Sequence, residues 1–145
     1  MAKKNLIVGQ SGGPTAVINS SLYGVVSEGL AHPDTIEHVY GMVNGIEGFL
    51  NDRVLDFEEV LPGEKLEYLT HTPGAYLGSC RYKLPESLED PVYPVLFRKF
   101  EELNIGWFFY IGGNDSMDTV SKLSRYAASI GSPIRVIGEP KTIDN

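Results

Sequence analysis

Residues 107–116 read Trp-Phe-Phe-Tyr-Ile-Gly-Gly-Asn-Asp-Ser, and this stretch decides the fold class. Its first five residues form a continuous apolar run, which is typical of a central strand buried on both faces of a sheet. Two glycines and three small polar residues follow, so we expect the strand to end in a turn that opens a helix. Apolar residues at 117, 120, 123, 127 and 130 have helical spacing and predict that helix.

The same order of strand, turn and helix is expected elsewhere in the chain. Strands that alternate with helices need crossover connections, which indicates an α/β fold with a doubly wound, mostly parallel sheet and helices on both faces. Between the second strand and residue 69 we expect turns with one helical turn, a short extended piece and a short helix. The expected strands are residues 5–8, 37–40, 107–111 and 135–137, and the expected long helices occupy 15–29, 92–104 and 117–130.

Composition excludes several classes of protein. The chain has 145 residues, 42% of them hydrophobic, which suits one domain or a piece of one. Its formal net charge of -7 disfavours non-specific binding to nucleic acid or to an anionic membrane. No apolar stretch approaches the roughly 20 residues that span a bilayer, and the single cysteine, Cys80, has no internal disulfide partner. These features predict a cytoplasmic protein.

The first polar cluster is the loop after the first strand, residues 9–15, Gly-Gln-Ser-Gly-Gly-Pro-Thr. Glycines such as Gly12 and Gly13 between a strand and a helix let the backbone approach a phosphate, and the amides of the helix start attract the anion. The alternative is a tight strand-to-helix turn without a ligand.

The second cluster follows the central strand and contains Gly112, Gly113, Asn114, Asp115 and Ser116. It has the composition of another phosphate loop, and an Asn with an Asp facing a phosphate can hold Mg2+. Because Asn, Asp and Ser are also good helix caps, a capped helix start is the alternative.

The third cluster follows the last strand and contains Lys141, Thr142 and Asp144. An ammonium, a hydroxyl and a carboxylate are the groups that phosphoryl transfer to an alcohol requires. The alternative is a polar turn. All three clusters lie at strand ends, so we expect them to meet at one edge of the sheet.

A fourth segment, residues 78–83, contains Arg81 and Lys83, which can contact phosphate oxygens or lie in solvent. The three histidines, His32, His38 and His71, show no metal-ligand spacing and are expected on the surface or in loops.

Together these motifs resemble the phosphofructokinase family. They are Ser-Gly-Gly at 11–13 with Asn19 in the following helix, Gly-Ser-x-Arg at 78–81, Gly-Gly-x-x-Ser at 112–116 and Thr-Ile-Asp-Asn at 142–145. The resemblance implies that residues 1–145 are the amino-terminal portion of the donor-binding domain, and that Mg2+ is the cofactor.

The resemblance also implies roles for individual residues. Asp144 matches the general base that deprotonates the 1-hydroxyl of fructose 6-phosphate, and Thr142 and Ile143 belong to the segment that contacts this sugar. Asn114 stands where the family has an aspartate associated with Mg2+, so a metal contact there would use a neutral, weaker ligand. The donor phosphates are assigned to Gly12, Gly13, Arg81, Gly112, Gly113 and Ser116.

Two positions bear on the donor. ATP-using members of the family have glycine where this chain has Asp115 and Lys141, whereas pyrophosphate-using members carry Asp and Lys. A carboxylate at 115 would repel a nucleotide's inner phosphate, and Lys141 would compensate the charge of the smaller donor. The sequence therefore predicts a reversible pyrophosphate-dependent phosphofructokinase, with ATP-dependent 6-phosphofructokinase as the alternative.

Family members are several hundred residues long, so we expect this chain to be incomplete, inactive in isolation and prone to associate, and the longer protein to be a homo-oligomer. Two other hypotheses are an NAD or lipid kinase, which would lack the motifs at 78–81 and 142–145, and a non-catalytic module that binds a phosphorylated ligand.

Overall fold

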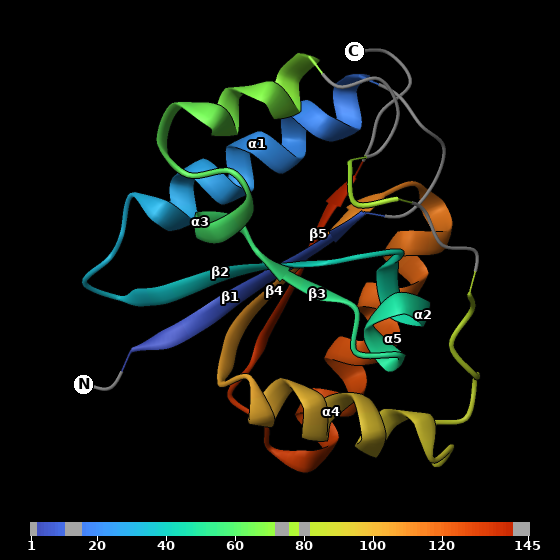
Figure 1. The fold of residues 1–145 in the computed structure, drawn as a ribbon. Helices are drawn as coiled ribbons and strands as arrows, with labels where there is room; N and C mark the ends of the chain where they lie inside the picture. The colour runs from blue at the N-terminus through green and yellow to red at the C-terminus, as the bar shows by residue number, and fades with distance from the viewer. Residues whose placement is uncertain (1–2, 11–15, 72–75, 79–81, 141–145) are drawn as a thin grey trace.

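A computed structural model describes residues 3–10, 16–71, 76–78 and 82–140. They contain a five-stranded sheet with the strand order β3-β2-β1-β4-β5 (Figure 1). All neighbouring strands are parallel except β2 and β3, which are antiparallel. The strands are β1 (Lys4–Gln10), β2 (Ile36–Met42), β3 (Val54–Asp56), β4 (Ile105–Gly112) and β5 (Arg135–Pro140).

Helices cover both faces of this sheet, as the predicted α/β fold requires. Figure 1 shows α1 and α3 on one side, and α2, α4 and α5 on the other. Among the described residues, no helix combines the length and apolar character that crossing a membrane requires. The helices are α1 (Ala16–Leu30), α2 (Gly45–Leu50), α3 (Phe57–Val60), the 3-10 helix η1 (Gly63–His71), α4 (Val92–Glu102) and α5 (Asn114–Ile130).

The core consists of two layers, one on each side of the sheet. Successive side chains of a strand point to opposite faces, so in β1 Leu6 and Val8 pack towards α1 and η1, whereas Ile7 packs towards α4 and α5. In β4, Phe108 and Tyr110 join the second layer, where Phe108 contacts an aromatic ring of α4. Burial of this apolar surface from both sides holds the parallel strands in place.

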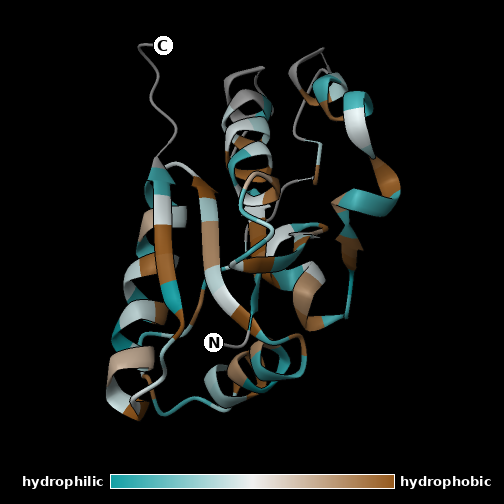
Figure 2. Cartoon of the chain, turned by 90° about the vertical axis from the view of Figure 1, so that its left-hand side faces the viewer, coloured by the Kyte–Doolittle hydropathy of each residue, from teal (hydrophilic) through white to brown (hydrophobic). Residues whose placement is uncertain are grey.

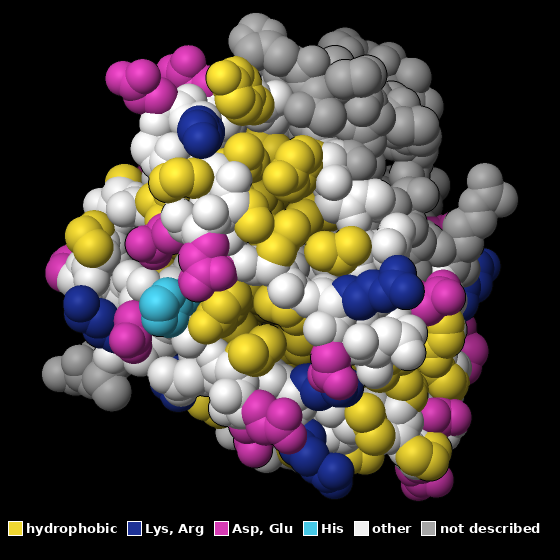
Figure 3. Space-filling view, in the orientation of Figure 1, with side chains coloured by type: hydrophobic (Ala, Val, Ile, Leu, Met, Phe, Trp, Pro, Cys, Tyr) yellow, Lys and Arg dark blue, Asp and Glu magenta, His cyan; other side chains and the backbone are white. Residues whose placement is uncertain are grey.

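Trp107 and Phe109, on the α1 side of the sheet, are only partly buried. A groove of about 520 Å³ lies between α1 and the strands, and Trp107, Phe109 and Glu139 contribute to its lining. Figure 2 shows apolar residues along β4 and β5. On the face shown in Figure 3, basic and acidic side chains are interspersed around apolar surface.

Candidate active site

The parallel strands that precede the expected site segments end at one edge of the sheet. Gln10 is paired with Ile111, and Gly112 is paired with Pro140, so β1, β4 and β5 end side by side. The strand order reverses at β1, whose neighbours are β2 on one side and β4 on the other. Ligands of doubly wound sheets bind outside the carboxyl ends of the strands at such a switch point.

Among the described residues, no side chain caps the start of α5 at this edge. Gly113 is the N-cap residue and has no side chain that could accept a hydrogen bond from the first turn. Asn114 and Asp115 are exposed, whereas Ser116 is buried. The alternative, in which Asn114, Asp115 or Ser116 caps the helix, is therefore wrong for the described residues. An uncapped helix start with a glycine before it has the chemistry of an anion site.

A buried pair of amide side chains lies directly below the edge. Gln10 Nε2 donates to Asn19 Oδ1 over 3.0 Å, and both side chains are fully buried. Gln10 Oε1 accepts from the Leu77 amide, and Asn19 Oδ1 accepts from the Tyr76 amide, each over 2.7 Å. The pair therefore fixes the chain just before the Gly-Ser-x-Arg motif. No sequence motif indicated this role, although a polar residue at the end of a buried strand was the available signal.

Gly78, the first residue of that motif, occupies a position that only glycine fits. Its φ angle is +80°, in the left-handed region, and a Cβ atom would lie 2.5 Å from Nδ2 of Asn44. The Asn44 amide also donates to the Leu77 carbonyl oxygen over 2.7 Å. The backbone of residues 77 and 78 is thus held against the turn before α2.

After the motif, the chain runs along the first turns of α5. Lys83 Nζ lies 3.9 Å from Oδ1 of Asp115, and both side chains are largely exposed. Further along, Lys122 Nζ donates to the Leu84 carbonyl oxygen over 2.8 Å. The structure therefore places Lys83 and Asp115, two residues singled out from the sequence, next to each other.

Two buried groups in this region have shifted pKa values. A hydrogen bond to Asp118 raises the pKa of Lys122 and outweighs burial, which acts in the opposite direction. Burial raises the pKa of the Tyr93 hydroxyl, and the nearby charge of Lys122 opposes this without reversing it. Both groups are therefore held in their protonated forms.

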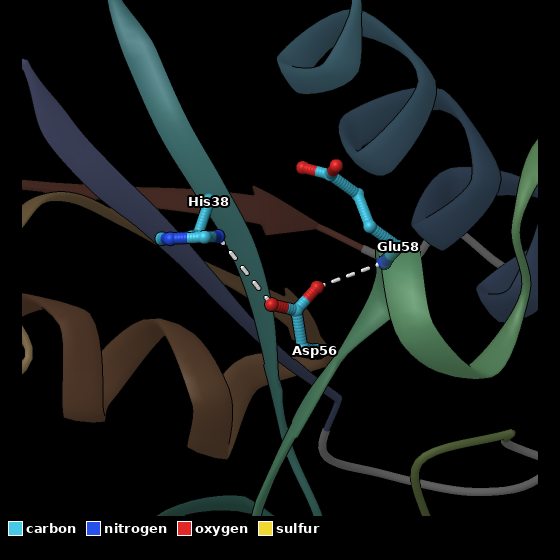
Figure 4. A group of neighbouring side chains, drawn as sticks. All are labelled: His38, Asp56 and Glu58. Carbon is cyan, nitrogen blue, oxygen red and sulfur yellow. Dashed lines mark hydrogen bonds and ion pairs between the residues drawn. The ribbon is translucent and has the colours of Figure 1, made fainter.

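One histidine belongs to a polar cluster that its sequence spacing did not predict. His38 on β2, Asp56 on β3 and Glu58 on α3 lie close together (Figure 4), with His38 Nδ1 3.4 Å from Asp56 Oδ2. Asp56 also caps α3, because its Oδ1 accepts from the Glu58 amide over 2.9 Å. This helix cap explains the arrangement, and His38 lies at the level of Leu6, away from the carboxyl edge of the sheet.

The other residues assigned from the sequence lie outside the described ranges. Their assigned roles in donor binding, sugar binding and proton transfer remain predictions. They are Gly12, Gly13, Arg81, Lys141, Thr142, Ile143 and Asp144.

Comparison with known proteins decides the family. The family model described as Phosphofructokinase matches residues 5–145. The chain belongs to the phosphofructokinase family. A pyrophosphate--fructose 6-phosphate 1-phosphotransferase from Methylococcus capsulatus is 42% identical over 146 residues, which cover all of this chain and 34% of that protein. A sulfofructose kinase from Alkalicoccus urumqiensis is 36% identical and covers 95% of the chain and 34% of its own length.

Solved structures of phosphofructokinases share the fold described above. The pyrophosphate-dependent phosphofructokinase of Nitrosospira multiformis superposes with a TM-score of 0.88 at 40% identity, covering 99% of this chain and 35% of that protein. The chain thus spans about a third of the length of these phosphofructokinase relatives. Its five-stranded domain corresponds to their amino-terminal part.

Proposed function

We propose that the chain is the amino-terminal portion of the donor-binding domain of a pyrophosphate-dependent phosphofructokinase. This enzyme transfers a phosphoryl group from pyrophosphate to the 1-hydroxyl of fructose 6-phosphate, and the reaction is reversible. The observation that carries the proposal is the uncapped start of α5, with Asp115 in its first turn, at the switch-point edge beside β1.

The donor binds at the loops of this edge. Backbone amides after Gly113 and the positive end of the helix dipole favour the diphosphate, while Gly12, Gly13 and Arg81 complete its contacts. Asn114 and Asp115 carry exposed oxygen atoms of the kind that Mg2+ prefers, so these side chains fit the ion. When bound, Mg2+ neutralises charge on the phosphate oxygens.

The acceptor is activated by Asp144. Its carboxylate accepts the proton of the 1-hydroxyl as that oxygen forms a bond to the terminal phosphorus of pyrophosphate. The bond from this phosphorus to the bridging oxygen breaks, and inorganic phosphate leaves. Lys141 offsets charge on the transferred group, and Thr142 and Ile143 position the sugar.

Asp115 determines the choice between donors in this mechanism. Its side chain is 81% exposed and stands at the helix start where the donor phosphates bind. A carboxylate there repels the inner phosphate of a nucleotide, whereas the smaller pyrophosphate leaves room for it. Lys83, 3.9 Å away, is a cation that partly balances this carboxylate.

The test is a donor assay on the enzyme at the full length of its relatives. We expect kcat/KM with pyrophosphate to exceed that with ATP by at least about a hundredfold, equivalent to roughly 2.7 kcal/mol. Replacing Asp115 and Lys141 together by glycine should raise the ATP rate, and Asp144→Ser should abolish transfer from either donor. Faster turnover with ATP than with pyrophosphate would overturn the assignment of the donor.

A second candidate concerns the acceptor. One relative of 36% identity is a sulfofructose kinase, so chains similar to this one include an enzyme named for a sulfonated sugar. Comparing kcat/KM for fructose 6-phosphate and sulfofructose with the preferred donor separates the two acceptors. A preference for sulfofructose would change the substrate but leave the donor site as proposed.

A further inference from the structure

Lys122 is a buried lysine with every donor satisfied. Its side chain is 2% exposed, although it lies on α5, where most polar side chains face solvent. Nζ lies 2.8 Å from the Leu84 carbonyl oxygen, 2.7 Å from Asp118 Oδ2 and 3.1 Å from Glu86 Oε1. An ammonium has three N–H donors, so these acceptors use all of them.

Two of these acceptors, on Leu84 and Glu86, belong to a segment that has no helix or strand of its own, whereas Asp118 lies in α5 itself. Residues 82–85 form neither, yet Leu84 is buried in the core and its carbonyl oxygen is bound by Lys122. The next carbonyl oxygen, that of Pro85, accepts from the hydroxyl of buried Tyr93. Side chains of α4 and α5 therefore donate the hydrogen bonds to these carbonyl oxygens that a neighbouring strand would donate in a sheet.

The chain is also fixed before this segment, at residues 76 and 77. Gln10 and Asn19 bind the amides of Leu77 and Tyr76, at the end of β1. In the sequence, residues 78–83 are therefore flanked by two fixed points, the amides bound by Gln10 and Asn19 before them and the Leu84 carbonyl bound by Lys122 after them. Lys122 lies seven residues after Asp115, about two helical turns along α5.

We propose that Lys122 is a positioning residue, which sets the register of residues 82–86 along α5 and thereby places Lys83 at the donor-binding start of that helix. This inference rests on the proposed function. Lys122 is buried about two helical turns beyond Asp115, so its proposed effect on the donor is indirect. Burying an ammonium carries a desolvation cost that an apolar residue would avoid. We infer that this cost is offset because Lys122 fixes the position of the Leu84 carbonyl.

The first experiment measures, without reference to catalysis, how firmly Lys122 holds residues 82–86. Trypsin can cut after exposed Lys83 only when buried Leu84 is released from the core. In the full-length enzyme we expect Lys122→Met to accelerate this cut at least about tenfold, and Lys122→Arg to restore much of the protection. The control is Lys99→Met, which removes a half-buried lysine of α4 that is paired with Asp52. Equal cleavage in Lys122→Met and wild type would overturn the proposal.

The second experiment measures the effect on the donor. We expect Lys122→Met to raise KM for pyrophosphate about tenfold while kcat changes less than about threefold, with KM for the sugar phosphate unchanged. A merely structural lysine would lower the amount of active enzyme, and hence kcat, without this split. Unchanged KM in a variant that is cut faster would overturn the positioning role.

The two experiments also separate this inference from the proposed function. A wild-type enzyme that neither turns over nor binds pyrophosphate would overturn the assignment of the donor, and the positioning role would fall with it. Trypsin cleavage would still show whether Lys122 holds residues 82–86. If pyrophosphate binds without turnover, its dissociation constant replaces KM, and the same tenfold change is expected.

Discussion

Gln10 donates a hydrogen bond to Asn19 over 3.0 Å, and neither side chain is exposed to solvent. This pair connects the last residue of β1 to α1, and its two oxygen atoms accept the amides of Tyr76 and Leu77. Buried hydrogen bonds therefore join the ends of two chain segments, residues 10 and 77, that precede loops assigned to donor binding. Its stability can be tested independently of catalysis.

Replacing Gln10 by Leu should lower the free energy of unfolding by about 1–3 kcal/mol, because it leaves the buried Leu77 amide without an acceptor. The measurement is urea denaturation. Asn51→Ala is a matched control, since its side-chain amide donates to Glu47 at an exposed position, and it should cost less than about 0.5 kcal/mol. A similar small loss for both variants would show that the buried pair contributes little.

Gly78→Ala should destabilise the chain more than Gly131→Ala does. Both glycines have positive φ angles, +80° and +67°, so each alanine carries a backbone strain of roughly 1–2 kcal/mol. Of the two, only Gly78 would also bring its new Cβ into a clash, 2.5 Å from Asn44 Nδ2, whereas at Gly131 no described atom beyond the adjacent backbone lies within 4 Å. Denaturant titrations of both variants measure the difference, which should be about 1–3 kcal/mol. An equal loss in the two would mean that Asn44 moves away freely.

Local patterns predicted the elements of the fold but not the contacts that connect them. The apolar run 107–111 and the spacing of residues 117–130 identified β4 and α5 because periodicity is a local property. The pairing of β3 with β2, which is antiparallel, depends on contacts between distant residues. The roles of Gln10 and Lys122 were missed for the same reason, since their partners lie 67 and 38 residues away.

Lys83→Met should affect donor binding far more than stability. The ion pair with Asp115 spans 3.9 Å between side chains that are 72% and 81% exposed, so a double-mutant cycle with Asp115→Asn should give a coupling below about 1 kcal/mol. If the site binds pyrophosphate, losing a nearby cation should raise its KM roughly tenfold. The control is Lys65→Met, at an exposed lysine of η1. Matching KM values in the two variants would place the donor elsewhere.

Stability should fall at alkaline pH. The pKa values of Lys122 and Tyr93 are raised by a hydrogen bond and by burial respectively. Folding therefore favours the protonated forms, and their contribution is complete below the unfolded pKa values of about 10. It is lost as the pH rises further, because the unfolded chain then releases protons more readily.

The measurement is the free energy of unfolding between pH 8 and 11, with Tyr93→Phe as the variant. Phenylalanine cannot ionise, so the decline above about pH 10 should be shallower than in wild type. Tyr68→Phe, at a side chain that is 62% exposed, provides the control for loss of a tyrosine hydroxyl. An unchanged slope in Tyr93→Phe would show that its burial does not contribute.

The isolated chain of 145 residues should associate through the α1 side of its sheet. The groove beside α1 is lined by Trp107 and Phe109, and apolar surface of this kind is normally covered by protein. Trp107 is the only tryptophan, so its fluorescence reports on this groove directly. With rising concentration we expect a larger sedimenting mass together with a blue shift of the emission.

Substitution can separate this face from the rest of the surface. Phe109→Lys should lower the sedimenting mass, since a charge in the groove opposes its burial against another chain. Val95→Lys is the matched control, because Val95 is an exposed apolar residue of α4 on the other side of the sheet. A chain that stays monomeric at every concentration and does not bind an apolar dye would contradict the prediction. Association reduced equally by both substitutions would place the contact outside the groove.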